Sequence, residues 1–433
     1  MNLELTGLIL LGLLLLFLAG GLWVGLALTA VASLGIVFFT SAPLGPVMSQ
    51  TYWSAVSGWS LAPLPLFIWM GEILFRTSLS EQIFSGLAPW LERVPGRLLH
   101  VNVVGSALFA GVSGSSAATA ATLGRMSIPE LRRRGYPDRL IFGSLAGSGT
   151  LGLLIPPSIM MIIYGVSAQV SIARLFIAGL LPGLMLVALF MGYLIVWALL
   201  HPHSLPQAAQ QTALGERLRA SARLLPLLAL IVGVIGSIYA GIATPTESAA
   251  LGVVGAMLIA ILSKSLSWNN FLDSLSGAVR TTAMIGFILA GSTLLTKTMA
   301  YTGIPSAIAA AISALHLPPY ALLAVLLVFF ILMGMFLDGI SMIVLTAAIL
   351  LPMVEAAHID LLWFGVFVVI VVEMAQITPP VGFNLFVLQG LSGRDGLKIA
   401  RDALAFFVVM IVAVGLLVAF PQIATWLPAQ MTH

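Results

Sequence analysis

Four short polar segments interrupt a very apolar chain, and they hold most of the residues that could bind an ion or a small anion. Residues 111–119 and 334–341 are rich in glycine, whereas residues 147–158 and 376–384 each contain a Pro-Pro pair. A backbone broken by Gly or Pro offers free carbonyl oxygens that can replace the hydration shell of Na⁺, and new helix N-termini offer N–H groups to an anion. Neutral side-chain ligands come from Ser113, Ser115, Ser116, Thr119, Thr150, Ser341, Thr378 and Asn384.

For each of these Ser and Thr residues taken singly, the alternative is helix packing through small side chains. Interruptions that occur in corresponding pairs are, however, typical of the binding sites of secondary transporters, which lie near the middle of the bilayer. We therefore expect the four segments to form a common site for small cations and carboxylates at membrane depth.

Asp338 is the acidic residue that most favours a cation, because it lies beside Gly339 in an otherwise apolar run. A charged side chain at the bilayer centre costs about 2.5–3.5 kcal/mol on insertion scales unless it is compensated. A bound cation is the expected partner, and a structural hydrogen-bonding role is the alternative. Glu373 is a weaker candidate for the same role. Glu72 precedes Arg76 by four residues, the spacing of an intrahelical ion pair.

The enzyme class that one motif could indicate is an intramembrane hydrolase. The segment Gly111–Gly114 (GVSG) fits the GxSG pattern of rhomboid-type serine proteases, which need a His base on a facing helix. All histidines are expected at the edges of membrane spans or in loops: His100, His201, His203, His316, His358 and His433. The sequence has no HExxH motif, no intramembrane Asp pair, no Walker A motif and no cysteine. We therefore do not expect an enzyme.

The composition is that of an all-α polytopic membrane protein. Of 433 residues, 60% are hydrophobic and 8% are charged, and the mean hydropathy is +1.12, far outside the range of soluble domains. Apolar segments recur along the chain and predict about eleven to thirteen crossings or half-crossings of a hydrocarbon core ~30 Å thick. Lipid contact is thus expected over much of the surface. The net charge of +3 and the short, dispersed Arg clusters give no support to nucleic-acid binding.

The second half of the chain repeats the pattern of the first. Identical residues stand 223 positions apart at Gly111 and Gly334, at Pro129 and Pro352, and at Pro156-Pro157 and Pro379-Pro380. At the same spacing, Arg132–Arg134 correspond to Glu355–Ala357, so equivalent turns carry opposite charge. Because cytoplasmic loops hold the excess of Lys and Arg, the two turns are expected on opposite sides of the membrane, which predicts inverted repeats.

The expected organisation follows from the repeats and from the local signals between them. Thr244, Pro245 and Glu247 predict the capping box of a helix that begins there. We expect N-terminal scaffold helices in residues 1–62, followed by a first repeat in 63–200 with an arm helix, a re-entrant hairpin and a broken helix at 140–170. A cytoplasmic linker is expected at 201–223, and further scaffold helices with a second arm are expected in 224–281. The remaining residues, 282–433, are expected to form a second re-entrant hairpin, a broken helix at 361–391 and a C-terminal helix.

Six motifs taken together resemble a known family over nearly the whole chain. They are GVSGSSAATAATLG with IPELRRRGYP, GTLGLLIPPSIMMIIYG, GIATPTESAA, GMFLDGISMIVLTAAILLPM and ITPPVGFNLFVLQG. In this order they closely resemble the DctM-like large membrane subunit of tripartite ATP-independent periplasmic (TRAP) transporters, in the ion-transporter superfamily. The resemblance implies a sodium-driven uptake carrier of a bacterial or archaeal inner membrane, with re-entrant hairpins and an elevator-like movement.

The resemblance also implies ligands, partners and roles for named residues. One Na⁺ site would use Ser113, Ser115, Thr150 and Pro156, and a second would use Asp338, Gly339, Thr378 and Pro379. The substrate would lie between the hairpin tips, near Ser113, Gly114, Ser115, Ser116, Thr119, Arg125, Ser341 and Asn384. Arg125 has an alternative role as an orientation charge on the cytoplasmic side.

The implied partners are a separate small four-helix membrane subunit and a periplasmic substrate-binding protein. The implied substrates are organic acids such as dicarboxylates, sugar acids and sialic acid. A stand-alone Na⁺- or H⁺-coupled anion carrier of the same superfamily is the alternative function.

Overall fold

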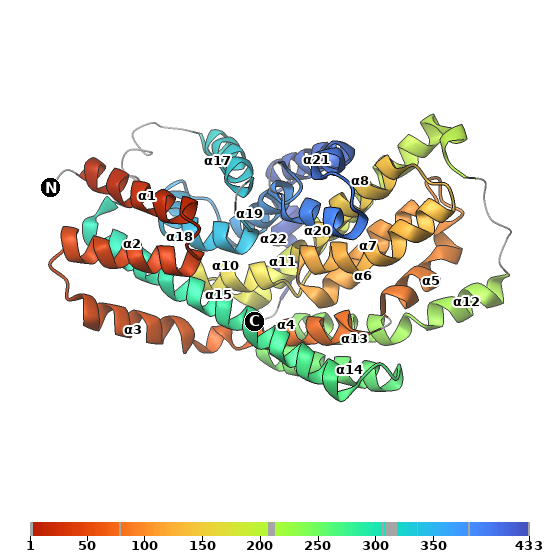
Figure 1. The fold of residues 1–433 in the computed structure, drawn as a ribbon, viewed down its shortest axis with the longest axis horizontal. Helices are drawn as coiled ribbons and strands as arrows, with labels where there is room; N and C mark the ends of the chain where they lie inside the picture. The colour runs from red at the N-terminus through yellow and green to blue at the C-terminus, as the bar shows by residue number, and fades with distance from the viewer. Residues whose placement is uncertain are drawn as a thin grey trace.

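The computed structural model describes residues 3–77, 79–206, 213–304, 307, 318–335, 337–379 and 382–431. Within these ranges the regular elements are all helices (Figure 1). A helix satisfies all its backbone N–H and C=O groups within one segment, which is what an apolar chain needs in hydrocarbon. The prediction of an all-α chain is confirmed.

Several helices are long and apolar enough to cross a membrane. The described ranges contain five single helices of this kind and three bent pairs that reach the same length together, which gives up to eight spans. The five are α11 (Ile172–Leu200), α14 (Pro245–Leu262), α15 (Trp268–Thr302), α18 (Gly339–Ala356) and α21 (Gly396–Ala419). Other apolar helices have 10–17 residues and, at 1.5 Å per residue, fall short of a ~30 Å core.

The N-terminal helices are divided where the sequence has turn residues. Gly20 and Gly21 separate the first two helices, and Gly21 has a φ of +78°, a conformation that favours glycine. The Glu72 carboxylate on the fourth helix forms the expected ion pair with Arg76. The elements are α1 (Leu3–Ala19), α2 (Val24–Phe39), α3 (Leu44–Val56), η1 (Trp59–Leu61), α4 (Pro63–Phe75) and α5 (Leu79–Leu91).

The next segment contains a helical hairpin and a broken helix. Gly114 turns the chain between the two hairpin helices, α6 (Leu99–Ser113) and α7 (Ser116–Arg133). The helical path from α8 bends by 44° at Pro156-Pro157, because proline has no N–H to continue the helix. The pieces of this broken helix are α8 (Asp138–Gly149), α9 (Leu151–Leu154) and α10 (Ile159–Ser167).

The middle of the chain contains more helix than the sequence predicted. The short η2 (Pro202–Ser204) and α12 (Leu214–Ala222) lie within the expected linker, and Trp90 Nε1 of α5 donates a hydrogen bond of 2.6 Å to Ser221 Oγ of α12. After α13 (Leu225–Tyr239), Thr244 and Glu247 form the predicted capping box at the start of α14. α15 runs without interruption through residues 281 and 282, between which the sequence analysis placed the boundary of two units.

The C-terminal part again contains a hairpin and a broken helix. The hairpin consists of α17 (Pro319–Gly334) and α18, and α19 (Leu361–Ala375) ends where α20 (Phe383–Ser392) begins after the Pro379 break. Pro380 lies outside the described residues. The chain continues through α21 to α22 (Gln422–Ala429).

Two groups of helices can be followed in Figure 1. In one, the long α15 packs along α2, α3 and α4, while α14 packs on α4 and α13. In the other, the first hairpin contacts α8, α9 and α20 through α7, and the second hairpin contacts α10 and α19 through α18. Each hairpin therefore packs on both broken helices.

Candidate ion- and anion-binding site

The tip of the first hairpin is a compact turn whose hydroxyl groups bond to one another. Gly114 ends α6 with a φ of +57°, and the Ser115 side chain caps α7 by accepting the Ala118 N–H at 3.4 Å. Ser113 Oγ and Thr119 Oγ1 lie 2.9 Å apart, and Thr119 Oγ1 donates to the Ser115 carbonyl at 2.8 Å. The tip thus concentrates hydroxyl and carbonyl oxygens in a small volume.

The first tip packs directly on the break of the first broken helix. A Cβ atom added to Gly152 would lie 2.5 Å from the Ser115 carbonyl oxygen and 2.6 Å from Ser116 Cα, and one added to Gly114 would lie 3.0 Å from the Pro157 carbonyl oxygen. These contacts join backbone to backbone. The structure therefore brings the tip and the break together, as the sequence grouped them.

Thr150 and Pro156 occupy different environments in this break. The Thr150 hydroxyl donates to the Gly147 carbonyl at 2.5 Å and lies 3.8 Å from Met410 Sδ on α21. Its side chain is thus directed toward α21, so only its backbone is free to serve a site at the tip. Pro156 is buried within the break, just before the point where Ser158 caps α10.

The tip of the second hairpin lies between the two broken helices. Cβ atoms added to Gly334 and Gly339 would collide with Ala375 Cβ and Met160 Cε respectively, and the one on Gly339 would also lie 2.8 Å from Val372 Cγ1. The second tip is therefore held by α10 from the first half and by the end of α19.

Asp338 is the N-cap of α18. Its carboxylate accepts the backbone N–H groups of Ile340 and Ser341 at 3.1 and 3.2 Å and the Ser341 hydroxyl at 2.5 Å. An acidic N-cap satisfies free backbone donors and interacts favourably with the positive end of the helix dipole. Asp338 therefore has the structural hydrogen-bonding role that was the alternative to binding a cation. Because the side chain is also exposed, its oxygens keep lone pairs for a further ligand.

The second break is stabilised mainly by its own backbone. The Thr378 hydroxyl donates to the Ala375 carbonyl at 2.7 Å, Gly382 N donates to the Thr378 carbonyl at 3.1 Å, and Asn384 N donates to the Gln376 carbonyl at 3.2 Å. Thr378 and Pro379 are half-buried. The break therefore turns the chain with its carbonyl groups on the inside of the bend.

The Asn384 side chain reaches from the second break toward the first hairpin. It is fully buried, and neither its Oδ1 nor its Nδ2 has a hydrogen-bond partner in the described part of the chain. A Cβ atom on Gly149 would lie 3.6 Å from Asn384 Nδ2 and 3.0 Å from Ala120 Cβ of α7. A buried amide without partners is expensive, so Asn384 is well suited to bind a polar ligand.

Glu373, the weaker candidate for binding a cation, belongs to the same region, and so does Gln376, which the sequence did not single out. Glu373 is 1% exposed and both its carboxyl oxygens lack hydrogen-bond partners among the described residues; the same holds for Gln376 Nε2. The polar neighbour of Glu373 is Ser116 at the start of α7. The signal in the sequence was the position of Glu373, 223 residues after Thr150.

Arg125 and His100 lie outside this region, and His316 and His433 are not among the described residues. The Arg125 guanidinium is exposed and stands 5.1 Å from the centre of the Phe75 ring on α4. His100 lies in the first turn of α6 and bonds to the Pro95 carbonyl at 2.6 Å, about 20 Å along the helix from Ser113. The two residues are too far apart for a Ser–His dyad.

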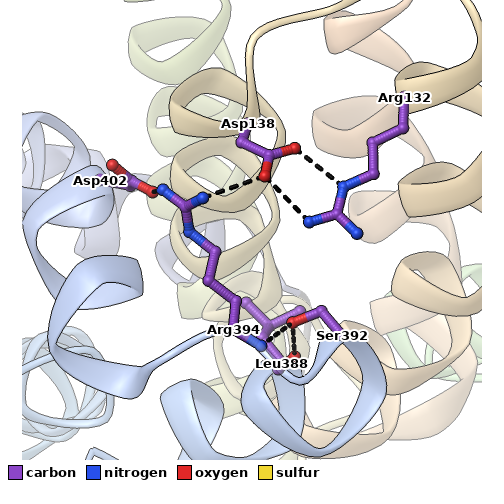
Figure 2. Close-up of polar contacts among 6 residues, drawn as sticks. All are labelled: Arg132, Asp138, Leu388, Ser392, Arg394 and Asp402. Atoms are coloured by element: carbon purple, nitrogen blue, oxygen red, sulfur yellow. Dashed lines mark hydrogen bonds and ion pairs between the residues drawn. The ribbon is translucent and has the colours of Figure 1, made fainter.

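A network of ion pairs joins α7, α8, the α20–α21 turn and α21 (Figure 2). Arg132 donates to Asp138 at 2.8 and 2.9 Å, and Arg394 donates to Asp138 at 3.0 Å and to Asp402 at 2.7 Å. Both guanidinium groups stand 5.2 Å from the centre of the Phe142 ring. The network ties the first hairpin and both broken helices together.

A cavity of about 890 Å³ opens between α15, α18 and the turn that follows α10. Its lining includes hydroxyl groups of both long helices and the acidic end of α18: Ser292, Thr293, Thr296 and Glu355. The lining also includes Gly165, Val166 and Ser167, at the end of α10 that is opposite to the Pro-Pro break.

Hairpin tips packed on paired broken helices, with unsatisfied polar groups at their junction, define a secondary membrane transporter. Solved structures with this fold include the Alcanivorax borkumensis YdaH transporter, with a TM-score of 0.65 and 14% identity over 95% of this chain and 99% of that one. Neisseria gonorrhoeae MtrF has a TM-score of 0.55 and 12% identity over 95% and 94% of the two chains. These similarities concern the fold alone.

Residues 11–423 match the model of the family described as the tripartite ATP-independent periplasmic transporter, DctM component. The chain belongs to this family, and it is a transporter subunit, not an enzyme.

Curated relatives support the same assignment. The Pseudomonas aeruginosa C4-dicarboxylate TRAP transporter large permease protein DctM is 31% identical, over 86% of each chain. The Vibrio cholerae sialic acid TRAP transporter large permease protein SiaM is 29% identical over 94% of this chain and 95% of its own. The Haemophilus influenzae permease protein SiaT is 30% identical over 91% of this chain and 67% of its own.

Proposed function

We propose that this chain is the permease subunit of a TRAP transporter that couples a Na⁺ gradient to the uptake of organic acid anions across a bacterial or archaeal inner membrane. Dicarboxylates, sugar acids and sialic acid are the proposed substrate class, since relatives are named for C4-dicarboxylate and sialic acid. The observation that carries the proposal is the junction of the first hairpin tip with both breaks, around the buried and unsatisfied Asn384.

The donor groups of this region fit Na⁺. Carbonyl and hydroxyl oxygens are neutral, hard ligands of the kind that replace the hydration shell of alkali ions. Among the described residues there is no group of three or more His, Cys, Asp or Glu that could hold a divalent metal. In the first proposed site, Ser113, Ser115, Pro156 and the Thr150 backbone supply oxygens. In the second, the exposed Asp338 carboxylate would act with Gly339, Thr378 and Pro379.

The proposed substrate position lies between the two tips. The N-termini of α7 and α18 direct backbone N–H groups and positive dipole ends toward an anion. Asn384 supplies an amide, and the hydroxyl groups come from Ser116, Thr119 and Ser341. Arg125 is a peripheral contact at most, because its guanidinium lies over Phe75 on α4.

We propose inverted repeats and an elevator movement for the same chain. Supporting contacts are reciprocal: α7 of the first hairpin packs on α20 of the second broken helix, and α18 of the second hairpin packs on α10 of the first. The ion pairs of Figure 2 would hold these elements together as one moving body. The group formed by α2–α4 and α13–α15 would be the scaffold against which they move.

The proposed partners are a small four-helix membrane subunit and a periplasmic binding protein that delivers the substrate. The cavity beside Glu355 is the proposed entry for the substrate. It lies at the C-terminal end of the first broken helix, whereas the ion-pair network of Figure 2 lies at the N-terminal end of that helix. The exposed apolar residues of α14, which include Leu251, Val254 and Leu258, suit contact with lipid or with the small subunit.

Reconstituted vesicles test the proposal. Uptake of a radiolabelled organic acid should require an inward Na⁺ gradient, the small subunit and the binding protein that carries that acid. Uptake by this chain alone would favour the stand-alone carrier, and uptake that ignores the Na⁺ gradient would contradict Na⁺ coupling. Omitting each component in turn separates these results.

A further inference from the structure

Glu373 is a carboxyl group enclosed by protein near the end of α19. Its side chain is 1% exposed, and neither oxygen forms a hydrogen bond within the described part of the chain. On its own helix it is flanked by the buried Val372 and Met374, which are apolar. The Ser116 hydroxyl is the polar group next to the Glu373 carboxyl, but the two do not form a hydrogen bond of normal geometry.

The elements packed against α19 bring no opposite charge to Glu373. These elements are α9, α10, α11, α17, α18, α21 and α22. Tyr164 of α10 donates its hydroxyl to the Leu361 carbonyl, at the far end of α19, and Tyr193 of α11 packs on Phe406. Their charged residues are exposed near helix ends or already paired, and none of them forms an ion pair or hydrogen bond with Glu373: Arg174, Asp338, Glu355, Lys398, Arg401 and Asp402.

The α7 helix, which supplies Ser116, also carries its charges at a distance. Arg125 is exposed over Phe75, and Glu130, Arg132 and Arg133 are paired near the other end of the helix. Glu373 thus has neither a counter-charge nor a full set of donors. An ionised carboxylate in such an enclosure is strongly disfavoured, and the usual outcome is that the group is neutral.

We infer that Glu373 is a proton-binding site, which holds a proton in the conformation described here and exchanges it when the first hairpin tip moves away. A proton is the cation that needs no shell of further ligands, and the neighbouring Ser116 hydroxyl is polar enough to stabilise the neutral acid. This site is separate from the two proposed Na⁺ sites.

The proton exchange is simple in chemical terms. When Ser116 separates from α19, water reaches the carboxyl group, the O–H bond breaks, and the proton passes to water while its electron pair stays on the carboxylate. When the tip closes, the carboxylate takes a proton from water and becomes neutral again. Proton binding stands on the geometry alone, whereas its use in transport rests on the proposed function.

Infrared difference spectroscopy tests proton binding directly. The full-length chain in lipid nanodiscs is titrated from neutral to alkaline pH, and the carbonyl stretch of protonated carboxylic acids is followed. We expect a band at neutral pH that disappears on alkaline titration and is absent in Glu373→Gln. The matched control is Glu355→Gln, which removes an exposed carboxylate and should leave the band unchanged.

Three results would overturn the inference. The first is a spectrum of Glu373→Gln that equals the wild type at every pH, since Glu373 would then be ionised. The second is a band that persists unchanged to alkaline pH, since the acid would then be structural. The third is a band that Na⁺ removes at constant pH, since Glu373 would then hold the metal ion. Circular dichroism establishes that each variant is folded.

Uptake measurements separate this inference from the proposed function. If both hold, the uptake rate of the wild type varies with pH and that of Glu373→Gln varies much less, at equal Na⁺ gradient. An infrared band that behaves as expected, in a chain that shows no uptake with any partner, would contradict the proposed function and leave proton binding intact.

Discussion

The closest backbone contact in the candidate site gives the sharpest prediction. Gly152 faces the Ser115 carbonyl group, and a Cβ atom there would lie 2.5 Å from its oxygen and 2.6 Å from its carbon. Ordinary van der Waals contact begins at 3.4 Å, so Gly152→Ala requires a displacement of nearly one ångström. The obstacle is backbone on both sides, which cannot rotate away as a side chain can.

Overpacking of this kind typically costs about 1–3 kcal/mol. The cost falls on the conformation in which the first tip is packed on its break. If Na⁺ binds only to this conformation, its apparent affinity falls by at most the same free energy, which sets an upper limit of about 5- to 150-fold. Gly152→Ala is therefore expected to lower the melting temperature and to need more Na⁺ for half-maximal stabilisation.

The assay is thermal unfolding in detergent over a series of NaCl concentrations, with choline chloride to keep the ionic strength constant. A ligand that binds the folded state raises the melting temperature by mass action. The control is Gly192→Ala on α11, where an added Cβ atom has no neighbour within 4 Å. An unchanged Na⁺ dependence in Gly152→Ala, with the control also unchanged, would refute the role of this contact in the Na⁺ site.

Three further substitutions or probes test the other parts of the site. Asp338→Asn keeps an acceptor at the N-cap of α18 but removes the charge, so Na⁺ activation of uptake should weaken; unchanged activation refutes the Asp338 assignment. Arg394→Gln leaves Asp138 and Asp402 without their shared cation and should lower the free energy of unfolding by about 1–2 kcal/mol, measured against Lys398→Gln, which changes an exposed residue in the first turn of α21. Ser113 should remain unlabelled by a fluorophosphonate, and stoichiometric labelling would revive the hydrolase hypothesis.

The breaks and caps of this fold could be predicted from the sequence because each depends on a few adjacent residues. The Gly20-Gly21 pair, the two Pro-Pro pairs and the Thr244 capping box impose their conformations locally. The hairpin tip at Gly114 follows the same logic. A local signal also indicates the cap at Asp338, because Asp is among the preferred N-cap residues; the argument from membrane depth gave priority to a cation instead.

The direction of side chains at the breaks could not be predicted in this way. The helical period is lost at a break, so the sequence did not indicate that the Thr150 hydroxyl faces Met410 and not the tip. Glu373 illustrates the same limit, since its neighbour Ser116 lies in the other half of the chain. Only the three-dimensional arrangement shows that its carboxyl group is enclosed without a counter-charge.

The reciprocal packing of the two halves bears on how the site can move. The first tip contacts Glu373 of the second half, and the second tip contacts Met160 of the first half. If each hairpin opened as an independent gate, it would have to leave the broken helix of the other half and expose these buried surfaces separately. Moving both hairpins with both broken helices as one body keeps these contacts during translocation itself, and the opening at Ser116 that would release the proton of Glu373 is then a separate, local step. The burial pattern therefore favours a rigid-body movement against α2–α4 and α13–α15.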